Sequence, residues 1–279
     1  MIEIHQLLKK ATILLNNISD TPQLDAEILL ADVLKKPRNY LYAWPEKKLS
    51  NSVQQHFLRV LKRRLMREPI AYIRGQVEFW SLSLDVTNTL IPRPETECLV
   101  ELILEYAGQG TRRLADLGTG SGAIALAIAS ERIHWEIVAT DINEAALVTA
   151  QQNAARLGLD HIHFKRGDWC QALSDTFDFI VSNPPYIGKR EWPKYAENLA
   201  YEPKEALLSG PDGLNDIKKI VASACNFLKP DGLLFLEHGS HQGPAVRDIL
   251  MAAQLIEVQT CKDLSNHERV TFGKNPSFR

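Results

Sequence analysis

The sequence contains few residues that could form a metal site or a disulfide framework. Its four cysteines, Cys98, Cys170, Cys225 and Cys261, are widely scattered, and no two of them form a C-x-x-C motif. We therefore expect no zinc site, no other bound metal and no disulfides. Unpaired cysteines are typical of the reducing cytoplasm, which is the location that we predict.

Long apolar runs are also missing. The longest, from Ala123 to Ala129, is far too short to span a bilayer. The first residues lack the basic segment and the apolar stretch of a secretory signal. The sequence therefore predicts no membrane partner.

No strong excess of one charge is present, because the formal net charge is −2 over 279 residues. The charge is nevertheless uneven: residues 1–75 carry 13 Lys and Arg against 7 Asp and Glu, whereas residues 76–279 carry 19 against 27. The acidic larger part argues against nucleic acid as a direct substrate. Five basic residues of the smaller part form either a docking surface or, as we favour, a solvated face: Arg59, Lys62, Arg63, Arg64 and Arg67.

The first 75 residues have helical patterns. Thr21-Pro22 predicts a helix start with a hydroxyl cap and a proline in the first turn. An apolar stripe at helical spacing follows it, formed by Leu24, Ile28, Leu29 and Val33. A second helix is predicted over residues 52–67. We interpret residues 1–75 as a small helical domain.

The pattern changes after residue 75. Residues 77–84 alternate as a strand does, and Asn88 indicates a turn, so residues 76–92 are predicted to form a β-hairpin linker. Strands and helices then alternate through residues 93–279, which predicts a mostly parallel sheet covered by helices on both faces. The strands are expected at 113–117, 136–140, 162–165, 177–182 and 233–237, with a closing antiparallel pair at 256–261 and 269–272.

A glycine-rich loop follows the first strand of the larger part, in the stretch from Asp116 to Gly122. Glycines allow a sharp turn and let a ligand approach the backbone. Asp141 ends the next strand, 23 residues after Gly118, where a carboxylate can accept hydrogen bonds from both hydroxyls of a ribose. The glycine-rich loop and Asp141 together indicate a nucleoside-bearing cofactor, either a dinucleotide or S-adenosylmethionine.

Two features favour S-adenosylmethionine over a dinucleotide. Asp116 precedes the first glycine and would repel a pyrophosphate, but it suits the ammonium group of a methionine moiety. The second feature, a proline-rich loop after the fourth strand, has no role in hydride transfer.

Asp168 and Trp169 follow the third strand. Asp168 could accept from an adenine amino group while Trp169 packs on the ring. It is equally good to interpret Asp168 as a turn residue and Trp169 as a core aromatic.

The proline-rich loop is Asn183-Pro184-Pro185-Tyr186. Two prolines cannot continue a strand, so the chain leaves the sheet as a stiff, extended loop. The Asn183 side-chain oxygen and the Pro184 carbonyl can then accept from one flat NH2 group, with the Tyr186 ring against its plane. A proline-stiffened strand exit without any chemistry is the simpler alternative.

The chain resembles the glutamine-N5 methyltransferases that modify class-I peptide chain release factors in translation termination. The matching stretches cover nearly the whole sequence: residues 25–30, 69–75, 91–97, 116–122, 181–186 and 237–239. The most specific features are Pro92-Arg93-Pro94-Glu95-Thr96-Glu97 and the helical N-terminal domain, because Asn-Pro-Pro-Tyr also occurs in enzymes that methylate the amino groups of nucleobases. Tyr201 stands where this family is expected to have Phe.

The resemblance implies a Rossmann-like, class I S-adenosylmethionine-dependent methyltransferase domain, residues 93–279, joined to a helical domain, residues 1–75, that docks the protein substrate. Together with the residue patterns, it gives these candidates for the methyl-donor site: Asp116, Gly118, Thr119, Gly120, Ser121, Gly122, Asp141, Asp168, Trp169 and Asn183. The candidates for catalysis and for holding the acceptor glutamine are Asn183, Pro184, Pro185 and Tyr186, with Leu90, Ile91 and Arg93 as possible walls. Glu237 and His238 are expected to be polar strand-end residues satisfied by their neighbours.

Two other functions are compatible with parts of the pattern. The acceptor could be a nucleic-acid base, which would require a large basic groove with aromatic platforms. The chain could also be a non-catalytic ribosome-binding protein, although an intact glycine loop, Asp141 and acceptor loop argue against it.

Overall fold

The computed structural model describes residues 2–87 and 89–277, which form two compact units, Met1–Gln76 and Val77–Arg279. The turn predicted at Asn88 lies outside the described residues. In this part of the chain, no helix is long and apolar enough to cross a membrane.

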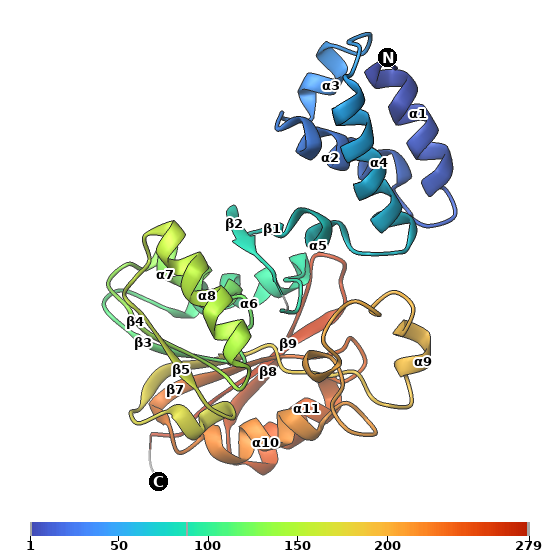
Figure 1. Ribbon diagram of the computed structural model, residues 1–279. Coiled ribbons are helices and arrows are strands. Elements are labelled where there is room, and N and C mark those ends of the chain that lie inside the picture. Colours follow the sequence, from blue (N-terminus) through green and yellow to red (C-terminus); the bar gives the residue numbers. More distant parts are fainter. Residues whose placement is uncertain (1, 88, 278–279) are drawn as a thin grey trace. The chain divides into compact units, whose positions relative to one another are not determined.

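The first unit is helical, as predicted. Ser50 caps its longest helix by accepting a hydrogen bond from the Val53 amide at 3.3 Å. The helices pack around a core that includes Ile4, Leu30 and Phe57. The unit consists of α1 (Ile4–Leu15), α2 (Pro22–Leu34), α3 (Asn39–Ala43), α4 (Asn51–Leu65) and α5 (Ile70–Arg74) (Figure 1).

The buried face of α2 differs from the predicted stripe. Of the four predicted apolar positions, only Leu29 is buried. The core-facing residues are Asp25, Ala26, Glu27, Leu29, Leu30 and Ala31. The expected hydroxyl cap is also wrong, because the Thr21 hydroxyl donates to the Asp25 carboxylate at 3.4 Å and accepts no backbone hydrogen bond.

Ion pairs explain why two acids of α2 can be buried. Arg64 of α4 donates to Asp25 at 2.7 Å, and Arg38 donates to Glu27 at 2.7 Å. A buried carboxylate is tolerated when a cation and hydrogen bonds compensate for lost water. Arg63 pairs with Glu68 at 2.5 Å. At least two of the five basic residues, Arg63 and Arg64, are therefore engaged within this unit.

The second unit is built on a seven-stranded sheet in the order β5-β4-β3-β6-β7-β9-β8, in which only the pairs β7–β9 and β8–β9 are antiparallel. The predicted parallel strands and the closing antiparallel pair are confirmed. β7 begins five residues earlier than expected, at Leu228. The strands are β3 (Arg113–Leu117), β4 (Glu136–Asp141), β5 (Ile162–Arg166), β6 (Phe177–Ser182), β7 (Leu228–Glu237), β8 (Ile256–Lys262) and β9 (Glu268–Lys274).

Two hydrophobic clusters cover the two faces of this sheet. Alternate residues of each strand face opposite ways, so Ile180 belongs to one cluster and Phe179 to the other. Residues of α6, α7 and α8 contribute to the Phe179 cluster, and residues of α10 and α11 to the Ile180 cluster (Figure 1). The helices of this unit are α6 (Glu97–Tyr106), α7 (Ala123–Glu131), α8 (Glu144–Leu157), α9 (Trp192–Tyr195), α10 (Asn215–Ala224) and α11 (Gly243–Ala252), with 3-10 turns η1 (Pro94–Thr96), η2 (Trp169–Ala172) and η3 (Lys204–Ala206).

A small hairpin of β1 (Gln76–Phe79) and β2 (Leu82–Asp85) precedes the sheet. Phe79 and Leu84 are buried in the Phe179 cluster. Asn153 of α8 also holds the hairpin, because its side chain donates to the Asp85 carbonyl at 2.9 Å and accepts from the Asp85 amide at 2.8 Å. The segment predicted as a linker is thus packed on the core of the second unit.

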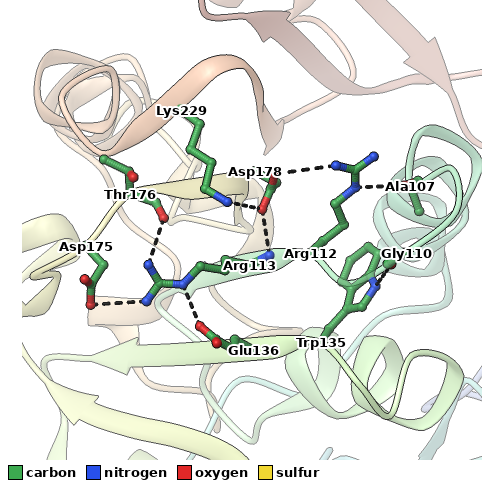
Figure 2. A network of polar contacts seen from close by, with 10 residues as sticks. All are labelled: Ala107, Gly110, Arg112, Arg113, Trp135, Glu136, Asp175, Thr176, Asp178 and Lys229. Carbon is green, nitrogen blue, oxygen red and sulfur yellow. Dashed lines mark hydrogen bonds and ion pairs between the residues drawn. The ribbon is translucent and has the colours of Figure 1, made fainter.

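A polar network ties the amino ends of the central strands together (Figure 2). Asp178 of β6 accepts from the Arg113 amide at 2.8 Å and from the Lys229 ammonium at 2.7 Å, which joins β3 and β7 to it. The Arg113 guanidinium pairs with Glu136 of β4 at 2.6 Å. Burial opposes ionisation of Asp178, but the hydrogen bonds from Lys229 and from the Arg113 amide hold its pKa below the usual value. The network therefore links β3, β4, β6 and β7 at the amino ends of the parallel strands.

Candidate active site

The loops after β3, β4, β5 and β6 all emerge at the carboxyl edge of the parallel strands. The chain runs outward from β3 through β4 to β5 and then returns to the other side of β3 with β6. Ligands of such sheets bind at the point where the strand order reverses. Here that point lies between β3 and β6, which carry the glycine loop and the Asn-Pro-Pro-Tyr loop.

Two cavities occur at this edge, of about 440 Å³ and about 400 Å³. Leu90, Asn183 and Ala206 line both of them. We call the first the donor cavity and the second the acceptor cavity. Because Asn183 lines both cavities, a ligand in the donor cavity and a ligand in the acceptor cavity can meet next to the Asn183 side chain.

The glycine loop lines the donor cavity with Gly118 and Gly120. Gly118 has a φ of 72°, and a β-carbon there would lie 2.9 Å from the Trp169 ring. Only glycine allows this backbone conformation and this close approach together. The indole of Trp169 thus lies over the loop, and it lines the donor cavity as predicted.

Asp141 lines the same cavity from the end of β4. One of its oxygens accepts from the Gly120 amide at 2.9 Å and the other from the Asn143 amide at 2.8 Å. Burial raises the pKa of this carboxyl, and the backbone amides oppose the rise. Each carboxylate oxygen still has acceptor capacity, which suits the two hydroxyls of a ribose.

Four predicted donor-site residues do not line the donor cavity: Asp116, Thr119, Ser121 and Gly122. Asp116 is fully buried and accepts from the Thr119 hydroxyl at 2.6 Å and from the Ala125 amide at 3.2 Å. Burial raises its pKa to about 7, against the lowering effect of these bonds. Asp116 thus holds the glycine-rich loop and the start of α7 through hydrogen bonds on the side away from the donor cavity.

Asp168 lies in the donor cavity with a cationic partner. It forms an ion pair with Lys219 of α10, and both side chains line the cavity. Lys219 was not predicted from the sequence, because a lysine on an amphipathic helix resembles any solvated position. The pair places a carboxylate and an ammonium beside Trp169.

The Asn-Pro-Pro-Tyr loop separates the two cavities. Pro185 faces the donor cavity, whereas Pro184 and Tyr186 face the acceptor cavity. The Asn183 amide donates from Nδ2 to the Thr96 hydroxyl at 3.2 Å. Its Oδ1 atom is buried and has no hydrogen-bond partner among the described residues, which leaves an acceptor at the junction of the cavities.

Tyr186 contacts a buried acid that the sequence did not identify as functional. Its hydroxyl donates to Glu237 Oε1 over 3.5 Å, and burial, reinforced by the Glu237 charge, raises the pKa of Tyr186. Glu237 Oε2 has no partner in the described part of the chain, so this residue is not fully satisfied by its neighbours as expected. His238 is satisfied by its neighbours as expected, because its ring nitrogens contact the Gly239 carbonyl at 2.9 Å and the Thr271 hydroxyl at 2.8 Å.

Arg93 lines the acceptor cavity and pairs with the buried Glu202, which also accepts from the Ile91 amide at 3.2 Å. Glu202 joins segments 109 residues apart. The available signal in the sequence was its position next to Tyr201, which was compared with the family. Gln242, another unpredicted residue of this cavity, donates to the Tyr186 and Asp212 carbonyls at 3.0 and 3.1 Å.

Comparisons with known proteins decide the family. The PrmC N-terminal domain matches residues 6–75, and the methyltransferase small domain matches residues 94–213. A release factor glutamine methyltransferase of Coxiella burnetii is 47% identical over 277 residues, which are 98% of this chain and 99% of that protein. The chain belongs to the release factor glutamine methyltransferase family.

Other members are similar over comparable lengths. The Vibrio cholerae enzyme is 44% identical over 100% of this chain and 99% of its own, and the Escherichia coli enzyme is 44% identical over 92% and 93%. A solved structure, the hMettl16 catalytic domain with a MAT2A 3′UTR hairpin, has a TM-score of 0.60 at 16% identity, covering 89% of this chain and 91% of that one. This likeness shows the fold alone. Together with the match to the methyltransferase small domain, it confirms the predicted Rossmann-like methyltransferase class.

Proposed function

We propose that this protein uses S-adenosylmethionine to methylate the side-chain amide nitrogen, N5, of a glutamine in class-I peptide chain release factors. The observation that carries the proposal is the unpartnered Asn183 Oδ1 atom at the junction of the donor and acceptor cavities. Family membership supports the same reaction. Release factors act in the cytoplasm, where we therefore place the protein.

The donor cavity fits an adenosine-bearing methyl donor. Asp141 would accept from the ribose hydroxyls, Trp169 would pack against the adenine, and Gly118 and Gly120 would let the ligand approach the backbone. We propose that Asp168 contacts the adenine edge while paired with Lys219. When bound, S-adenosylmethionine supplies an electrophilic methyl group.

The acceptor loop would hold the glutamine. Its amide nitrogen is a poor nucleophile, because the lone pair is shared with the carbonyl. Asn183 Oδ1 and the Pro184 carbonyl would accept its two hydrogens and so fix the direction of the nitrogen. Tyr186 would pack against the amide plane, and Arg93 would wall the cavity. The nitrogen becomes acidic as it gains the methyl group, so water suffices to remove its proton.

One assay tests the proposal. The protein is incubated with labelled S-adenosylmethionine, purified release factors and RNA, and peptide mass spectrometry locates the added methyl. We expect it on the glutamine of a Gly-Gly-Gln loop, where small residues let the side chain reach a narrow cavity. Methyl groups found only on nucleic-acid bases, with unmodified release factors, would instead support the nucleobase alternative.

A single substitution tests the proposed role of the loop. Asn183→Ala removes one of two acceptors for the substrate NH2 and should lower kcat by about two orders of magnitude, as removal of one preorganised polar contact does. The affinity for S-adenosylmethionine should change much less. Asn226→Ala is the matched control, because this exposed residue follows α10 and lines neither cavity.

A further inference from the structure

The orientation of the Asn183 amide is set by a residue of a distant segment. Asn183 can serve as an acceptor only if Oδ1, and not Nδ2, points to the junction of the cavities. A primary amide can flip by half a turn and exchange the two atoms. The surroundings must therefore distinguish the oxygen from the nitrogen.

Thr96, at the end of η1, is in a position to make this distinction. Its hydroxyl oxygen accepts from Asn183 Nδ2 at 3.2 Å across 87 residues of sequence. Thr96 is 3% exposed, so water does not compete freely for this contact. A hydroxyl could also donate, however, and the direction of its own proton decides which end of the amide it prefers.

Glu237 is a buried acid whose electrostatics depend on Thr96. It is 1% exposed, and burial raises its pKa to about 7. The hydrogen-bonding effect of Thr96 is the largest of the contributions that oppose the rise. In the contact between Thr96 and Asn183 the hydroxyl oxygen is the acceptor, which fits Nδ2 and leaves Oδ1 free for another donor.

The other end of the acceptor loop also contacts a buried side chain. Tyr186 donates to Glu237 Oε1 over 3.5 Å, while Asn183 donates to the Thr96 hydroxyl at 3.2 Å. The first and last residues of the Asn-Pro-Pro-Tyr loop thus each contact a buried residue of another segment. The two prolines between them leave the backbone little freedom to adjust.

We propose that Thr96 is a positioning residue that holds the Asn183 amide with Oδ1 toward the acceptor nitrogen. This inference rests on the proposed function, since it assigns the acceptor role to Asn183. Thr96 does not need to touch the substrate. Its effect is to disfavour the flipped amide, in which two NH2 groups would face each other and the substrate would lose an acceptor.

The test compares Thr96→Val, Thr96→Ser, Asn183→Ala and the double variant Thr96→Val/Asn183→Ala in methylation of a whole release factor. Valine keeps the shape but removes the hydroxyl, and we expect about a tenfold fall in kcat, the scale of one lost hydrogen bond, with KM within about twofold. Serine should restore most of the rate. Adding Thr96→Val to Asn183→Ala should cause no further loss, since the side chain to be positioned is gone.

Thr260→Val is the matched control. It removes a hydroxyl that accepts from Arg247 at 2.7 Å and contacts the Thr271 hydroxyl at 2.8 Å, and Thr260 lines neither cavity. This variant should lower thermal stability without lowering kcat. If Thr96→Val acts only by weakening the fold, the two variants should behave alike, and the proposed positioning role would be wrong.

A measurement without the methyl donor separates this proposal from the function on which it rests. In protein labelled with 15N-asparagine, the Asn183 side-chain signal is identified by its loss in Asn183→Ala. We expect one Nδ2 proton to exchange slowly with solvent in wild type and at least tenfold faster in Thr96→Val. Equal exchange, or multiplicative losses of kcat in the double variant, would overturn the proposal. A protected amide in a protein that leaves release factors unmodified would reject the function and retain the positioning contact.

Discussion

The donor cavity makes a quantitative prediction for Asp141→Asn. In the structure each carboxylate oxygen already accepts one backbone amide, from Gly120 at 2.9 Å and from Asn143 at 2.8 Å. A bound ribose would add two hydrogen bonds to a charged acceptor. Asparagine keeps the shape, but it removes the charge and replaces one acceptor by an NH2 group that would face a backbone N–H.

The expected loss follows from these contacts. A hydrogen bond to a charged group contributes about 1.5–3 kcal/mol, and the neutral amide keeps one acceptor, so we expect the variant to lose about 2 kcal/mol of binding free energy. This corresponds to roughly a 30-fold increase in the Kd for S-adenosylmethionine. Alanine at the same position removes both acceptor oxygens and should cost about 1–3 kcal/mol of binding free energy, the scale of lost charge-assisted hydrogen bonds.

Isothermal titration calorimetry measures the effect directly. Asp175→Asn is the matched control, because Asp175 lies at the opposite end of the strands, paired with Arg113 at 3.2 Å (Figure 2). It should leave the Kd unchanged. A Kd for Asp141→Asn within twofold of wild type, with the fold intact by circular dichroism, would refute the ribose assignment. Tight NADH binding without S-adenosylmethionine binding would refute the cofactor.

Three further outcomes are expected. Burial raises the folded-state pKa of Glu237 to about 7, so the stabilisation from its protonated form is complete below pH 4.5 and is lost as pH rises through 7. Over this range, urea unfolding should show that the free energy of unfolding of wild type falls by about 3 kcal/mol relative to that of Glu237→Gln. Parallel curves of unfolding free energy against pH for the two proteins would contradict this prediction. Gln242→Ala removes the side-chain amide that donates to both the Tyr186 and the Asp212 carbonyls. It should lower the free energy of unfolding by about 2 kcal/mol and raise the KM for release factor. An unchanged KM would show that this contact does not affect substrate binding. Arg59→Ala with Lys62→Ala, which changes two exposed basic residues of α4, should leave the KM for release factor within about twofold. A KM that rises with salt for the whole factor but not for a glutamine peptide would instead indicate docking.

Local patterns in the sequence determined the elements and the loops that carry the chemistry. Alternating and apolar runs give strand positions because side chains on a strand repeat every two residues, and β3 and β6 occur at the predicted bounds. The glycine loop, Asp141 and Asn183 follow strands of a parallel sheet, whose carboxyl ends must share one edge. Their common location could therefore be predicted once the sheet was.

Only the tertiary structure decided which side chains face the ligand and which support it. Asp116 turns into the core and binds the loop that it precedes. Thr96 meets Asn183 from 87 positions away, and Glu202 meets Arg93 from 109. Such pairings leave no periodic signal, because each depends on where two separate segments meet. Burial of Asp25 likewise depended on Arg64 of another helix, since a charge enters a core only when a distant partner compensates for its lost hydration.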